Sequence, residues 1–263
     1  MTQKSPIRSV TTRSAAVLAL VAIGIAEATA AGMIGINFTD SGEGNLGTSE
    51  IAGAVPQDFF NNVGGVGFIN STGLLNDDGL ETTVSMVGNP SNGDHFLGTV
   101  PVSSDAKFMD GYWDVTENPV TLNFSNLNSL TDGQAYSVLV YTDGDGLLRR
   151  GQFELLNATT GNAVYFTEDN GDFPINGTTL NYVRSLATTD TQAEALTGIN
   201  NYVRFDGVTG NSFSIRAFGS GPNTDALRAP INGIQIVTVP EPSTLLSLVG
   251  SVGMLLSLRR RTR

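Results

Sequence analysis

The sequence predicts an all-β protein whose body forms a single β-sandwich or jelly roll between two apolar end segments. Three observations support this. Short stretches of alternating apolar and polar residues recur, glycine is abundant at 31 residues, and helical periodicity is rare. Of the 263 residues, roughly 210 remain once both ends are set aside, which suits one large β domain better than two small ones.

Residues 1–30 have the pattern of a secretory signal peptide. An apolar run at 15–26 (AAVLALVAIGIA) follows three basic residues, Lys4, Arg8 and Arg13. Ala28 and Ala30 form a small-residue cleavage site, so we expect cleavage after Ala30, with Ala31 as the alternative. An uncleaved anchor helix is the other interpretation, but the apolar run is short for a membrane span.

Candidate strands follow through the body, and several alternate as half-buried strands do. They cover residues 33–38, 82–87, 120–124, 135–141, 152–156, 163–166, 202–205, 212–218 and 233–239. The apolar run within 137–141 (SVLVY) is almost continuous, which indicates a central strand. The only helix candidates are short, at 56–61 and 191–197.

Turn signals separate these strands, because Gly, Asn and Asp reach the backbone angles that tight turns need. They are Asp132-Gly133, Asn176-Gly177, Asp206-Gly207 and Thr209-Gly210-Asn211. The tetrapeptide Asn-Tyr-Val-Arg occurs twice, at 181–184 and 201–204. Two such matches do not make a repeat protein, and similar strand environments or chance explain them.

The body is strongly acidic. Residues 31–240 carry 7 basic and 23 acidic side chains, a net charge of −16, against −11 for the whole chain. Such a body repels nucleic acid, so no nucleic-acid partner is expected, and it attracts divalent cations. The absence of cysteine excludes thiol catalysis, thiolate zinc sites and iron–sulfur clusters.

A calcium site is one interpretation of the acidic loops. Asp143 and Asp145 lie in a DGDG loop directly after the central strand, and carboxylates on such a loop suit Ca²⁺. Leu148 stands where an EF-hand needs glycine, so the loop is not an EF-hand. The alternative is an ordinary hairpin turn, and the stretches 168–172 and 223–225 share this ambiguity.

Tyr112 and Trp113 are candidates for ligand binding. An exposed aromatic ring beside polar groups is a common surface for stacking a sugar, whereas burial in the core is the alternative for the chain's single tryptophan.

No enzymatic activity is predicted. His95 is the only histidine, which excludes sites built on histidine pairs, and the chain has no Gly-x-Ser-x-Gly elbow. No carboxylate pair stands out for glycoside hydrolysis among the many acids.

The final segment, 240–263, has three parts. Pro240-Glu241-Pro242 comes first, an apolar stretch at 245–258 follows, and Arg259, Arg260, Arg261 and Arg263 close the chain. With Ser243 and Thr244 the apolar stretch spans about 24 Å as a helix, slightly less than a hydrocarbon core, and the arginines are expected to stay cytoplasmic.

This segment resembles the PEP-CTERM sorting signal of bacterial exported proteins. The resemblance implies recognition by an exosortase, cleavage at or near Pro240-Glu241-Pro242, and release to the cell surface or the exopolysaccharide matrix of a biofilm. The alternative is an ordinary tail anchor.

The body itself is loosely similar to malectin-like and other galactose-binding-type jelly rolls. The similar stretches are 34–38, 120–124, 136–141, 150–153 and 229–236, the last with an Asn-Gly-Ile pattern in its closing strand. This resemblance implies a fold and identifies no ligand residues.

Together these patterns predict a signal peptide at 1–30, a β-sandwich at 31–239 and a sorting signal with a transmembrane helix at 240–263. The chain is expected to use the secretion machinery, to stay transiently in the inner membrane, and to reach the surface or matrix through an exosortase. There it would be a non-enzymatic carbohydrate-binding or structural module, with polysaccharide as the candidate partner and structural Ca²⁺ as the candidate cofactor. The alternative is a secreted glycan-active hydrolase.

Overall fold

The computed structural model describes residues 32–40, 44–65, 67–89, 93–98, 101, 103–144, 149–169, 182–188, 200–220 and 227–238. The predicted signal peptide and sorting signal lie outside these ranges. Within them, no helix has the length and apolar character that a membrane crossing requires.

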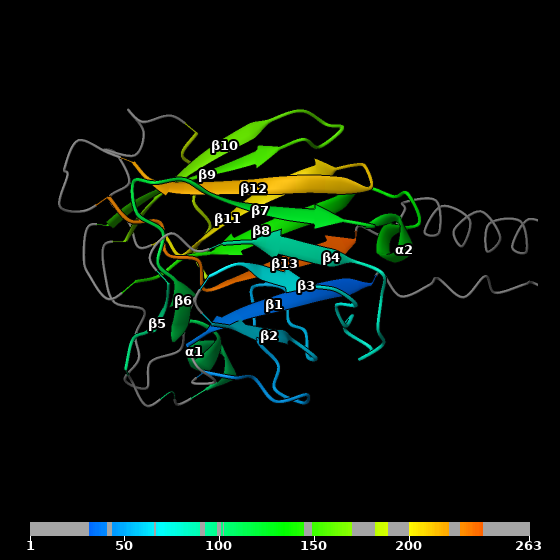
Figure 1. Cartoon of the computed structure of the whole chain (residues 1–263), viewed down its shortest axis with the longest axis horizontal. Helices are drawn as coiled ribbons and strands as arrows, with labels where there is room; N and C mark the ends of the chain where they lie inside the picture. The colour runs from blue at the N-terminus through cyan, green and yellow to red at the C-terminus, as the bar shows by residue number, and fades with distance from the viewer. Residues whose placement is uncertain are drawn as a thin grey trace, which may run out of the picture.

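The described chain is built almost entirely from strands, which confirms the all-β prediction (Figure 1). A five-stranded sheet has the order β11-β8-β13-β1-β2. Its strands are β11 (Tyr202–Val208), β8 (Tyr136–Tyr141), β13 (Gly233–Thr238), β1 (Met33–Thr39) and β2 (Asn61–Gly64).

A six-stranded sheet has the order β10-β9-β12-β7-β4-β3. Its strands are β10 (Ala163–Asp169), β9 (Arg149–Leu156), β12 (Ser212–Gly219), β7 (Val120–Ser125), β4 (Ser85–Gly88) and β3 (Ile69–Ser71). The pair β5 (Asp94–Phe96) and β6 (Gly111–Trp113) lies near α1 (Ser104–Phe108) at one end of the molecule, and α2 (Asn128–Thr131) lies at another (Figure 1).

One apolar core joins the two sheets. Buried side chains of both belong to the same cluster, among them Ile36 and Val140 of the five-stranded sheet and Leu122, Phe153 and Ile215 of the six-stranded one. Strand β7 shows the expected alternation of buried and exposed residues. The core therefore contains the residues that the period-two pattern assigns to one face of each sheet.

The other face of the five-stranded sheet is covered as well, which explains why every residue of β8 is buried. Leu139 and Tyr141 point away from the main core and pack in a second cluster with Phe60 and Phe108. The segment 44–60 and helix α1 supply this cover, and it is a layer that alternation alone does not predict.

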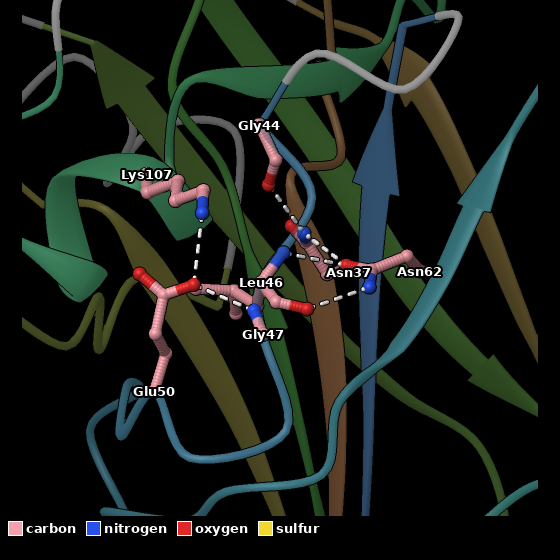
Figure 2. Close-up of polar contacts among 7 residues, drawn as sticks. All are labelled: Asn37, Gly44, Leu46, Gly47, Glu50, Asn62 and Lys107. Carbon is pink, nitrogen blue, oxygen red and sulfur yellow. Dashed lines mark hydrogen bonds and ion pairs between the residues drawn. The ribbon is translucent and has the colours of Figure 1, made fainter.

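Two asparagines hold the start of this cover on the sheet (Figure 2). Asn37 Nδ2 donates to Gly44 O and to Asn62 Oδ1, both at 2.8 Å. Asn62 in turn accepts from Leu46 N at 2.9 Å and donates to Leu46 O at 2.8 Å. The amide groups thus replace backbone partners that the irregular segment would otherwise lack.

A carboxylate fixes the next turn of the same segment (Figure 2). Glu50 Oε2 accepts from Gly47 N at 2.5 Å and lies 2.8 Å from Lys107 Nζ of α1. The hydrogen bond from Gly47 and then the one from Lys107 lower the pKa of Glu50 below its ordinary value.

Every predicted strand has a counterpart, but the helix predicted at 56–61 is wrong. Gln57 forms an isolated bridge with Ala52, and Asn61 begins β2. The side chain of Asn61 joins two other segments, because its Nδ2 donates to Gly35 O and to Leu75 O. These tertiary contacts override the local helix propensity. The helix predicted at 191–197 lies outside the described residues.

Several short elements were not predicted. Strands β2, β3, β5 and β6 have only three or four residues, too few for a period to show. Helix α1 begins after Ser103, whose Oγ accepts from Ala106 N at 3.1 Å, a capping contact that the sequence could have indicated.

Candidate functional site

The structure brings two predicted site residues, Trp113 and Asp143, to one junction, which centres on Asn232. Trp113 and Ile231 exchange two backbone hydrogen bonds of 2.9 and 3.0 Å. Asp143 N donates to Asn232 Oδ1 at 2.5 Å. Asn232 Nδ2 donates to Met109 O and Gly111 O, at 2.7 and 3.1 Å.

Dense packing explains why asparagine and glycine occupy positions 232 and 233 of this junction. Asn232 is fully buried, and a Cβ added to Gly233 would collide with the Phe108 ring and with Ile36 O. The Asn-Gly pattern before β13 therefore ties three chain segments together, and the junction is a structural feature.

Trp113 lies in the core. Its side chain is fully buried, and its ring centroid is 4.3 Å from that of Phe38. Tyr112 is only 3% exposed and stacks against His95 at 5.8 Å. A sugar-stacking surface needs an exposed ring face, and Trp113 has none, so we assign the pair to the core and not to a ligand-facing surface.

Asp143 is also buried, at 3% exposure, whereas Asp145 lies outside the described residues. The described ranges contain no group of three or more His, Cys, Asp or Glu side chains that could hold a metal ion. Ca²⁺ takes six to eight oxygen ligands, so Asp143 alone would be one member of a larger set. The calcium site stays a prediction.

His95 lies at the surface beside this junction. Its side chain is 46% exposed, and its Nε2 is 3.8 Å from Asp114 Oδ2. Arg228 forms an ion pair with the same buried carboxylate. These two contacts compensate the charge of Asp114. They do not test the prediction that the chain has no enzymatic activity.

A tyrosine network lies on the covered face of the five-stranded sheet. Tyr182 Oη donates to Asp105 Oδ1 at 2.8 Å, and the same oxygen accepts from Gly53 N at 2.9 Å. Tyr141 Oη donates to Gln235 Oε1. Burial raises the pKa of both tyrosines, so both remain neutral hydroxyls that fasten the covering segment.

Sequence reasoning missed a further site, which the two Asn-Tyr-Val-Arg tetrapeptides form. The described residues 182–184 of the first copy lie beside the second: Arg184 and Tyr202 form a parallel bridge, and Asn201 N donates to Val183 O at 3.0 Å. Asn201 Oδ1 accepts from Val183 N at 2.8 Å. The repeat was visible in the sequence, but only the fold shows that its copies are neighbours.

The two arginines converge on one carboxylate. Arg184 Nη2 lies 3.1 Å from Asp206 Oδ2, and Arg204 Nε lies 2.6 Å from Asp206 Oδ1. Ser137 Oγ donates to Asp206 Oδ1 at 2.8 Å and accepts from Arg204 Nη2 at 3.1 Å. We call Arg184 and Arg204 the arginine pair.

The environment of Asp206 favours its charged form. Partial burial would raise its pKa, but hydrogen bonds from Ser137 and Arg204 and the charges of the arginine pair lower the pKa below its ordinary value. Asp206 is therefore an anion at neutral pH, and it neutralises one of the two guanidinium groups.

A β-bulge presents Asp206 to the arginines. Phe205 pairs with Val138 and Val208 with Tyr136, so the register of β11 shifts between them. Gly207 has a φ of +67° within this shift. The turn predicted at Asp206-Gly207 is thus wrong: the dipeptide lies inside β11, where its left-handed backbone forms a bulge that aims a side chain outward.

Comparison of the chain with family models, curated proteins and solved structures found no match in any of the three.

Proposed function

We propose that the chain is an exported protein, sorted by a PEP-CTERM-type signal to the cell surface or extracellular matrix. Its two sheets form a single jelly-roll-type β-sandwich over 31–239, which acts without catalysis as a carbohydrate-binding or structural module. Its partners are the secretion machinery, an exosortase, the inner membrane before sorting, and matrix polysaccharide.

The observation that carries the sorting proposal is the three-part sequence that follows β13. Pro240-Glu241-Pro242, the apolar stretch at 245–258 and the arginines at 259–263 occur in the order that membrane retention and cleavage require. Strand β13 ends at Thr238, two residues before Pro240. Cleavage at that motif would therefore leave the sheet intact.

The packing supports the single-domain part of the proposal. Buried residues from both sheets share one core, and strands from the beginning and end of the body, β1 and β13, are adjacent. A division of 31–239 into two independent domains would separate these strands.

The arginine pair supports the carbohydrate-binding role over a purely structural one. It places partly exposed guanidinium groups beside half-buried tyrosines on an otherwise acidic body. Recognition of sugars combines such flat apolar rings with a few directed polar groups.

The sorting proposal is tested by producing the full chain in host cells with and without an exosortase. Mass spectrometry of the extracellular form should give an N-terminus at Ala31 or Gly32 and a C-terminus near Pro240–Pro242. Substituting Pro240 and Pro242 by alanine should leave the protein cell-associated. An extracellular form that retains Arg259–Arg263 would contradict the proposal.

The carbohydrate role is tested on an array of bacterial exopolysaccharides with the full chain in mild detergent. Binding without release of sugar supports a binding module, and release of sugar supports the hydrolase alternative. If the chain neither binds nor releases sugar, the structural role is favoured.

A further inference from the structure

We propose that the arginine pair binds the carboxylate group of an acidic sugar in the matrix polysaccharide. This inference rests on the carbohydrate-binding part of the proposed function and names the class of sugar.

The balance of charge is the first argument. The ion pairs Lys107–Glu50 and Arg216–Glu154 each join one cation to one carboxylate. Arg184 and Arg204 instead share Asp206. One positive charge is left over at a place where the body as a whole is strongly negative.

Free donor groups are the second argument. A guanidinium has five N–H donors in a planar fork that matches a carboxylate. In the described part of the chain, the contacts of Arg184 and Arg204 use only Nη2 of the first and Nε and Nη2 of the second. Both Nη1 groups remain, and the side chains are 29% and 32% exposed, so an anion can reach them.

Preorganisation is the third argument. Arg184 Nη2 is held by Arg204 O at 2.7 Å, and Arg204 is held by Ser137, which is fully buried. Ordering two long side chains normally opposes binding, and here the fold has already ordered them.

The tyrosines define the ligand as a sugar. Tyr182 and Tyr202 each stand two residues before an arginine of the pair, are half-buried, and have ring centroids 6.4 Å apart. A uronic acid has a sugar ring that can stack on a tyrosine and a carboxylate that can bind a guanidinium. A free inorganic anion has no ring to stack. Tyr202 is the candidate for stacking, because Tyr182 is held in the covering segment by Asp105 and Gly53.

A structural role alone is the competing explanation, because the same contacts fasten residues 182–188 to β11. That explanation predicts a loss of stability on substitution and no effect on any ligand. The two explanations therefore separate in a binding experiment.

The experiment measures binding of an oligogalacturonate to the full chain in mild detergent at low salt. The same oligosaccharide with methyl-esterified carboxyl groups is the ligand control. We expect Arg184→Gln and Arg204→Gln each to weaken binding about tenfold or more, since each removes a charge-assisted hydrogen bond. Arg216→Gln removes a somewhat more exposed arginine, at 40%, that pairs with one carboxylate, and it should leave binding unchanged.

Asp206→Asn separates binding from folding, because it removes the competing carboxylate. We expect it to lower thermal stability yet to tighten oligogalacturonate binding severalfold. Equal binding of the methyl ester would overturn the inference and retain carbohydrate binding. Absence of binding, or binding that Arg184→Gln and Asp206→Asn do not alter in folded protein, would also overturn it.

Discussion

Gly32 O accepts two hydrogen bonds from Thr238, from its backbone N at 3.3 Å and from its Oγ1 at 3.0 Å. These are the first and last described residues of the body, and each lies within two residues of a predicted processing site. Both ends therefore emerge at the same end of the five-stranded sheet, so a domain tethered by its C-terminus would expose its new N-terminus close to the membrane.

The place of β13 in the sheet predicts that the body cannot fold without this strand. Strand β13 lies between β8 and β1 and buries Ile234 and Ile236 completely. A chain of residues 31–238 should unfold cooperatively, whereas residues 31–232 should lack that transition because two strand interfaces are lost. Circular dichroism melts of both chains check this, and a cooperative melt of the shorter one would contradict it.

Asn232→Ala should destabilise the fold by about 2–4 kcal/mol, since it leaves Asp143 N, Met109 O and Gly111 O buried without their amide partner. Asn232→Asp should cost at least as much, because a carboxylate would face two carbonyl oxygens. Urea denaturation measures both, with the exposed Asn118→Ala as control. A loss as small as that of the control would show that the junction tolerates these gaps.

Trp113→Ala should cost about 3–5 kcal/mol, as expected for truncation of a large core residue. Trp113→Phe should cost on the order of 1–2 kcal/mol, because indole Nε1 is buried and has no hydrogen-bond partner among the described residues that phenylalanine would lose. Thermal melts followed by circular dichroism compare the two. Equal, near-zero losses would place Trp113 outside the core.

Glu50 should contribute a pH-dependent part of stability. Its folded pKa lies below its unfolded pKa, so its contribution is present above the unfolded value and is lost as pH falls through the folded one. The gap in melting temperature between wild type and Glu50→Gln should be visible at neutral pH and should shrink as the pH falls through the lowered pKa of Glu50. The gap will be small because both Glu50 and Lys107 are about a third exposed. Glu117→Gln, in an exposed turn, is the control, and a gap that persists in acid would contradict the assignment.

Calcium should raise the melting temperature of the chain relative to EDTA if Asp143 and Asp145 bind it, because a ligand of the native state alone stabilises that state. Asp145→Asn should remove the rise, and it is the better variant since Asp143 is part of the Asn232 junction. An unchanged melting temperature on adding calcium would reject the site.

Much of the strand framework followed from the sequence. The period-two patterns located β1, β7, β9 and β12, because each of these strands faces the shared core with alternate residues. The continuous apolar run of β8 also indicated a central strand, and the structure adds the reason: segment 44–60 and α1 cover its second face.

The candidate site could not be derived in the same way. The Asn-Tyr-Val-Arg repeat was visible in the sequence, but the site that it forms depends on a parallel contact between segments 20 residues apart. It also depends on a β-bulge at Gly207, and the Asp-Gly pattern there is equally typical of a turn. Likewise, the burial of Trp113 is set by Phe38 and Ile231, which lie far from it in the chain.

The sequence by itself determined the all-β class, the acidic charge of the body and the places of its longer strands along the chain, because these depend on composition and local periodicity. Only the tertiary structure decided which side chains meet: it placed Trp113 in the core, Asn232 at a junction and two arginines on one carboxylate. Non-local contacts carry no local signature, so residues of the same type became core, scaffold or candidate site according to the neighbours that the fold gave them.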